Sequence, residues 1–394
     1  MPRFWGGDVD APGVLRERRA LRAAGLVGGP IELIDLVLPL WAGAAIGLRA
    51  TEVGVLVAVV AAFALLARPV ARVLAERWDR RHTAAVGAAL YALACTGYAV
   101  AQSAPLAYGA AAVGGAGGAL LWVAVRAIVG EREADDTEAF LRVTSARDVG
   151  AWPTAVLGLV FFGMVGFAGL FWACAAMCVL AAVILLTAPR RPTGADEGRE
   201  DNAPAEVGTG RRWPASVAEA MAAAAGAAVG LLLVLHLQRG FDLGVVQVVL
   251  VLVPGSMAAG LAILHVRRHV SRHGRRRVSA VGSLVGCATT LGFALAPNPY
   301  VIAGLWMISG AAWGAVLSVR QAVVEASARP VLGVQDTAGL VGLVVGSLAA
   351  GLLYDGVQWW AACVVGAAMV LAGAVALRLA VDLLGIADAP LAKA

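Results

Sequence analysis

Two carboxylates near the start of the chain stand within an otherwise apolar run, and they are the residues best placed for chemistry. Glu32 and Asp35 lie three residues apart in a run that extends from about residue 24 to 47. In a helix both side chains lie on one face. A charge inside a membrane costs about 2.5–3.5 kcal/mol, so these carboxylates should face a cavity or a partner. They are candidates for binding a proton or cation, and the alternative is a structural ion pair with Arg126 or Arg147.

A second group of charged residues gathers at the ends of the apolar runs. An acid between arginines at a helix end can pair with neighbouring helix ends and hold one conformation closed, although each exposed pair contributes only about 0–1 kcal/mol. The alternative is that these arginines only anchor the chain in the membrane. The candidates for such a gate are Glu76, Arg77, Arg80, Arg81, Arg126, Glu131, Arg147, Asp148, Arg272, Arg275, Arg276, Arg320 and Glu325.

Other kinds of chemistry are not indicated. The sequence contains no Ser-His-Asp, H-E-x-x-H or P-loop pattern, which argues against an enzyme. His265, His269 and His273 repeat at intervals of four, but six arginines in the same segment would repel a cation. We therefore expect no metal site and no cofactor.

The composition excludes a soluble globular protein. Of the 394 residues, 60% are hydrophobic and only 14% are charged, and the mean hydropathy is +0.80. A soluble domain carries about 25% charged residues. Each apolar segment can cross the roughly 30 Å of a bilayer as a helix. The sequence predicts twelve such spans, at about residues 24–47, 52–75, 83–102, 105–129, 139–165, 167–187, 216–238, 243–265, 278–296, 300–325, 337–354 and 358–384.

The arginines predict the orientation. The connections expected outside hold only Arg49 and Arg239, whereas the alternate connections hold nearly all the other basic residues. By the positive-inside rule both termini face the cytosol, and the chain is a multi-pass protein of the cell membrane. The net charge of +5 thus reflects arginines that anchor the chain in the lipid bilayer, and no nucleic-acid partner is expected.

The predicted spans form two sets of six. Residues 188–214 are rich in Pro, Gly and acids and are expected to be a cytosolic linker. The predicted organisation is a cytosolic segment 1–23, a six-helix bundle 24–187, the linker, a six-helix bundle 215–385 and a cytosolic tail 386–394. Polar residues also recur between the halves: Arg126 and Glu131 correspond to Arg320 and Glu325 at an offset of 194. Parallel repeats of this kind are typical of transporters.

The connection between the second and third spans resembles a loop motif of the major facilitator superfamily, G-x-L-A-D-R-x-G-R-R. This chain has Leu74-Ala75-Glu76-Arg77 followed by Asp79-Arg80-Arg81, with Arg72 and Asp79 at the two glycine positions. The resemblance extends to the six-plus-six layout and implies two bundles in a pseudo-two-fold arrangement, of the drug-efflux-like branch. It departs in the fourth span, where Ala111 stands at the position of an arginine in drug/proton antiporters.

The resemblance also implies a central cavity reached alternately from each side, lined by the first, fourth, seventh and tenth spans. Glu32 and Asp35 would face this cavity, and Trp122, Trp306 and Trp313 could stack there on an aromatic or amphipathic substrate. We expect a monomer that exports a small amphipathic molecule in exchange for protons. The alternatives are uptake of a mostly apolar molecule by symport or facilitated diffusion, and a transporter-like receptor or structural protein.

Overall fold

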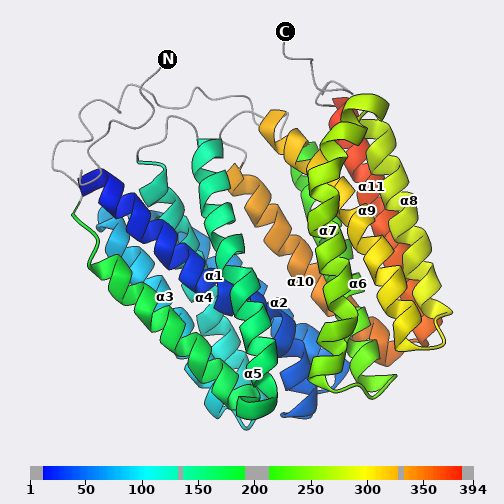
Figure 1. Ribbon diagram of the computed structural model, residues 1–394, viewed down its shortest axis with the longest axis horizontal. Helices are drawn as coiled ribbons and strands as arrows, with labels where there is room; N and C mark the ends of the chain where they lie inside the picture. The colour runs from blue at the N-terminus through cyan, green and yellow to red at the C-terminus, as the bar shows by residue number, and fades with distance from the viewer. Residues whose placement is uncertain (1–11, 132–135, 191–212, 327–331, 384–394) are drawn as a thin grey trace. The chain divides into compact units, whose positions relative to one another are not determined.

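The computed structural model describes residues 12–131, 136–190, 213–326 and 332–383, and every regular element in these ranges is a helix (Figure 1). Helices are expected, because a backbone inside lipid must satisfy its hydrogen bonds within its own segment. The elements are α1 (Pro12–Ala44), α2 (Ala50–Arg77), α3 (Arg80–Val100), α4 (Ala104–Val129), α5 (Asp136–Leu186), α6 (Trp213–Arg239), α7 (Val245–His273), α8 (Arg275–Ala294), α9 (Pro299–Ala326), α10 (Leu332–Gly356) and α11 (Trp359–Leu383).

The long element α5 consists of two helices that meet at Gly166. This glycine has φ 62° and ψ −168°, a non-helical conformation that favours glycine. The chain reverses direction there (Figure 1). The predicted fifth and sixth spans end and begin on either side of this residue, so the described chain contains twelve helices in eleven elements.

The first helix begins earlier than the predicted span. α1 starts at Pro12, and proline suits a first helical position because its missing N–H has no partner there anyway. The described part of the predicted segment 1–23 is therefore helical. Most of the predicted linker, residues 191–212, and the predicted tail lie outside the described residues.

The helices group into two compact units. The first contains Met1–Leu38 and Val59–Ala205, and the second contains Pro39–Ala58 and Glu206–Ala394. The last turns of α1 and the first turns of α2 thus belong to the second unit. There the carboxylate of Asp355, on α10, accepts hydrogen bonds from the backbone N–H of Thr51 at 2.8 Å and from its hydroxyl at 2.7 Å. Asp355 therefore caps the N-terminus of α2.

Candidate functional site

Close packing of α5 on α1 brings charged side chains together in the first unit. A Cβ on Gly28 would lie 2.6 Å from the carbonyl oxygen of Arg147, and a Cβ on Gly150 would lie 1.8 Å from that of Gly25. Only glycine permits so close an approach of two backbones. Glu32 follows Gly28 by about one helical turn and is thereby placed beside Arg147.

Three residues of the first unit form a carboxylate–guanidinium–indole cluster, which we call the first triad: Glu32, Arg147 and Trp122. Arg147 donates a hydrogen bond to the Glu32 carboxylate. Its Cζ also lies 5.5 Å from the ring centroid of Trp122, on α4, within the range of a cation–π interaction. The triad thus combines a predicted coupling residue, a predicted gate residue and a predicted cavity tryptophan. Its Glu32–Arg147 pair is the structural alternative that the sequence analysis offered for the acids of this span.

Asp35 lies three residues after Glu32 and is exposed. It interacts electrostatically with Glu32 and Arg147, but among the described residues it forms no ion pair. The triad contains one negative and one positive side chain. Asp35 is therefore the acid on this face of α1 that forms no ion pair among the described residues.

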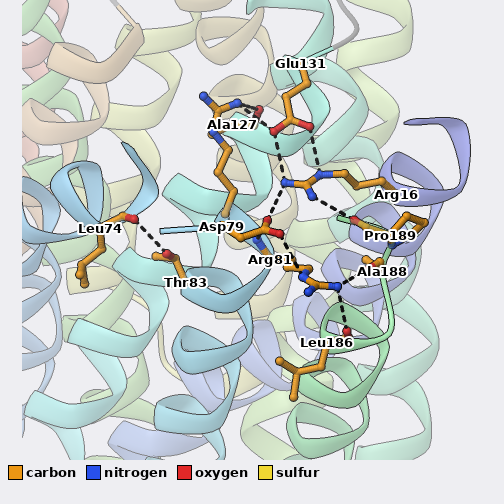
Figure 2. A network of polar contacts seen from close by, with 11 residues as sticks. Arg16, Leu74, Asp79, Arg81, Thr83, Ala127, Glu131, Leu186, Ala188 and Pro189 are labelled. Carbon is orange, nitrogen blue, oxygen red and sulfur yellow. Dashed lines mark hydrogen bonds and ion pairs between the residues drawn. The ribbon is translucent and has the colours of Figure 1, made fainter. Parts of the chain in front are cut away.

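A network of charged residues joins four helices of the first unit at the end where α1 begins (Figure 2). Arg16 is only 2% exposed, and its guanidinium contacts two carboxylates. One of its N–H groups donates to Asp79 Oδ1 at 2.9 Å, and its Nε lies 3.0 Å from Glu131 Oε2. Arg80 donates to Glu131 at 3.0 Å, and Arg81 lies 3.1 Å from Asp79. We call Arg16, Asp79, Arg80, Arg81 and Glu131 the basic-end network.

Backbone carbonyls at helix ends balance the excess of arginine in this network. Arg16 donates to the Pro189 carbonyl at 3.0 Å, and Arg81 donates to that of Ala188 at 2.6 Å, both just beyond the end of α5. Arg80 donates to the Ala127 carbonyl, near the end of α4, at 3.0 Å. The last carbonyls of a helix lack intrahelical partners, and cations are favourable there. The network therefore fixes the ends of α4 and α5 against α1 and the α2–α3 connection.

Asp79 stands where the family loop motif has glycine, and it has two structural roles. Its carboxylate caps α3 by accepting from the backbone N–H of Arg81, and it also accepts from Arg16. Burial by itself raises the pKa of this carboxyl. The hydrogen bonds and charges of Arg16 and Arg81 outweigh burial, so the pKa lies below its ordinary value of 3.8.

The other predicted gate residues have different surroundings. Glu76 and Arg77 are exposed and have no polar side-chain partner within the described part of the chain. Arg126 is half-buried in the last turn of α4. In the second unit Arg276 pairs with Asp382, Arg272 is exposed and Arg275 is half-buried. The side chains of Asp148 and Glu325 lie outside the described residues.

Arg320, predicted as a gate residue, has an acidic partner that the sequence analysis did not single out. It donates to the carboxylate of Glu219 on α6. Its Cζ lies 5.7 Å from the ring centroid of Trp313, on its own helix. Glu219 is the single acid in the predicted span 216–238, and this isolation was the signal available in the sequence. The remaining predicted cavity tryptophan, Trp306, donates its indole N–H to the Leu252 carbonyl at 3.0 Å.

Comparison with known proteins decides the family. A model of the Major Facilitator Superfamily matches residues 23–268, which is more than half of the chain. The chain belongs to this superfamily. The match begins within α1, includes α2 to α6 and ends in α7. A comparison with curated protein sequences found no match.

Solved structures extend the likeness to the whole chain. The nucleoside transporter NupG is 12% identical with a TM-score of 0.71, and the match covers 93% of this chain and 98% of that one. A bacterial homolog of the human lysosomal transporter Spinster is 16% identical with a TM-score of 0.69, covering 97% of each chain. The xylose transporter XylE from E. coli is 14% identical with a TM-score of 0.67, covering 96% and 97%.

At these identities the likeness shows the fold, which is the major facilitator fold predicted from the sequence. Family and fold together make this superfamily member a multi-pass membrane protein of the transporter class. Eleven of its described helices are long and apolar enough to cross a membrane.

Proposed function

We propose that this superfamily member works by alternating access at the cell membrane, as a monomer with cytosolic termini, and exports a small amphipathic compound in exchange for protons. This would place it in a drug-efflux-like branch. Asp35 is the proposed proton-binding residue, and Glu32 is its paired neighbour. Trp306 is proposed to contribute to the substrate cavity.

The observation that supports proton coupling is the contrast between two acids on one face of α1. Glu32 is paired with Arg147, whereas Asp35 is exposed and forms no ion pair among the described residues. A carboxylate within a span is costly to keep charged, and it is usually functional. Because Glu32 and Arg147 neutralise each other, a proton on Asp35 changes the local charge from −1 to 0.

This change of charge can be linked to transport. With Asp35 protonated, the residues around it are neutral and can be carried between conformations without a bound compound. With Asp35 ionised, the negative charge favours a substrate with cationic character. A carrier that alternates between these two states exchanges protons for substrate.

We also propose that the basic end of the first unit contributes to the gate. Glu76 and Arg77 lie beside the basic-end network and are without polar side-chain partners within the described residues, so they are available to pair with other helix ends. A difference of 1–3 kcal/mol between two conformations, or roughly a few exposed pairs, is enough to shift their populations.

The test is proton release or uptake by purified protein on addition of lipophilic cations and neutral amphipathic compounds. The wild type is compared with Asp35→Asn and Glu32→Gln. Asp242→Asn is the matched control, because Asp242 is exposed and lies in the α6–α7 turn. We expect a substrate-dependent proton signal in the wild type and the control, and none in Asp35→Asn.

Two results would overturn this proposal. Binding of a compound by the wild type without proton movement would exclude antiport and favour facilitated uptake. Movement of no compound together with capture of one defined protein partner would favour a receptor. Reconstituted vesicles with an imposed pH gradient of either sign then give the direction of transport.

A further inference from the structure

The second unit contains a cluster of the same composition as the first triad, which we call the second triad: Glu219, Arg320 and Trp313. Glu219 and Arg320 form an ion pair in which the side chains are 22% and 11% exposed. The guanidinium of Arg320 lies over the ring of Trp313, with Cζ 5.7 Å from its centroid. Each unit therefore holds one arginine between a carboxylate and an indole.

The internal repeat of the sequence does not by itself generate both clusters. The counterpart of Arg320 at an offset of 194 is Arg126, but the arginine of the first triad is Arg147. Arg147 comes from α5, whereas Arg320 comes from α9 and shares that helix with its tryptophan. Two different sets of helices thus arrive at the same three chemical groups. Because the repeat does not explain both clusters, their recurrence indicates that the protein requires a guanidinium held by a carboxylate and an indole in each unit.

The carboxylate and the indole hold the guanidinium from two different directions. A carboxylate accepts hydrogen bonds at the edge of the planar guanidinium, and an indole attracts its face. Because an arginine side chain has many rotamers, one contact alone would leave it free to rotate about that contact. The tryptophan is therefore the group that selects which rotamer meets the carboxylate.

We infer that Trp122 and Trp313 are positioning residues, which act on transport through Arg147 and Arg320, and that Glu219, Arg320 and Trp313 form a second ion-pair site required for turnover. This inference rests on the proposed transport function. It changes the expected role of both tryptophans, because the sequence assigned their rings to the substrate. In each case one face of the indole instead carries a guanidinium group.

A double-mutant cycle tests whether Trp313 acts through Arg320. The variants are Trp313→Leu, Arg320→Lys and the double variant, with Trp313→Phe as the conservative replacement that keeps an aromatic face. Trp360→Leu is the control, because Trp360 is 58% exposed and its indole donates only to Gln358. The probe is ethidium, a planar lipophilic cation whose fluorescence reports its movement into vesicles, or the compound from the panel above that the wild type moves fastest.

The inference predicts a particular pattern of kinetic constants. Trp313→Leu and Arg320→Lys should each lower the maximal transport rate about 3- to 30-fold, the range of a cation–π contact, with little change in the half-saturating concentration. The double variant should be no slower than the slower single variant. Lysine cannot stack on the indole as the planar guanidinium does, so both changes remove the same stacking contact. Trp313→Phe should recover most of the rate. Combining Trp313→Leu with Arg147→Lys should instead multiply the two effects, because these residues belong to different triads.

The opposite pattern would overturn the inference. If Trp313→Leu raises the half-saturating concentration and its effect multiplies with that of Arg320→Lys, the indole contacts the substrate directly. The same cycle is measured on the thermal unfolding midpoint, which needs no substrate. A wild type that moves no compound would refute the proposed function, whereas additive midpoints would separately refute the coupling of Trp313 with Arg320.

Discussion

The two triads contain the same three chemical groups in different surroundings. In the first triad the carboxylate and the arginine are 43% and 33% exposed, and another acid, Asp35, lies one helical turn beyond the carboxylate. In the second triad the two charged groups are 22% and 11% exposed, and the position three residues beyond Glu219 is Ala222, which is buried. We infer that the carboxylate and indole common to both triads position an arginine. The first triad differs by one additional acid, Asp35, and we propose that this acid couples transport to protons.

The largest expected loss of stability comes from placing an acid beside the second triad, at the position that corresponds to Asp35. Ala222 is 6% exposed, and its backbone lies against α11 near Gly373. Because position 222 is buried against α11, a carboxylate introduced there would lose its contact with water, so Ala222→Asp should destabilise the protein by about 2.5–3.5 kcal/mol. Thermal unfolding in detergent measures the loss, with Ala222→Ser as the control. A stable variant with a new substrate-dependent proton signal would show that burial does not separate the two units.

The next prediction compares the loss of stability when the arginine of each ion pair, Arg320 or Arg147, is removed. Arg320→Met leaves Glu219 with little water around it and should cost about 2–3 kcal/mol, below the roughly 3–5 kcal/mol of fully buried pairs because this pair is partly exposed. Arg147→Met leaves Glu32 more accessible to water and should cost about 1 kcal/mol, closer to a surface pair. The two unfolding midpoints give the order. Equal losses would mean that exposure does not determine the strength of the pairs.

A smaller effect compares the basic ends of the two units. Arg16→Gln removes a buried partner of both Asp79 and Glu131, each of which keeps a second arginine, so we expect a loss of about 1–2 kcal/mol. Arg276→Gln breaks an exposed pair with Asp382 and should cost about 0–1 kcal/mol. Chemical denaturation of the purified variants provides the comparison, with the exposed Arg18→Gln as an additional control.

The smallest effect is the dependence of stability on pH through Asp79. Its pKa is lower in the folded protein, so the unfolded chain binds more protons and stability rises with pH. The contribution is complete above the ordinary value of 3.8 and is lost as the pH falls toward the folded pKa. It should amount to less than about 1 kcal/mol, because the group is only partly buried. Asp79→Asn should flatten this part of the profile, and an unchanged profile would exclude the contribution.

The sequence predicted the fold because its signals are local. Long apolar runs and the arginines between them are sufficient to predict the twelve described helices, and even the boundary between the fifth and sixth helices falls at Gly166 as expected. The start of α1 at Pro12 was missed, because the first turns carry Arg16, Glu17 and other charged residues that an apolar-run criterion excludes. These charges are compatible with a buried helix only because other helix ends supply their partners.

The members of the candidate site were predictable from the sequence, but its pairings only in part: Arg147 was one of two arginines expected as a partner of the acids in α1. Glu32, Arg147 and Trp122 were all identified from the sequence, yet nothing in their spacing shows that one arginine contacts both of the others. Glycines such as Gly28 determine that contact, and their effect depends on which helix lies against them. Arg16 and Glu219 were missed for the same reason, since their partners are 63 and 101 residues away or more.

The cap that Asp355 provides for α2 has a consequence for the order in which the protein is built. Thr51 and Asp355 are separated by 304 residues, so α2 emerges from the ribosome long before its capping group has been synthesised. Chains are made at about 5–20 residues per second, which leaves this helix end without the Asp355 cap for roughly 15–60 seconds. The N-terminal half is therefore synthesised before the carboxylate that caps its second helix, and α10 supplies that carboxylate.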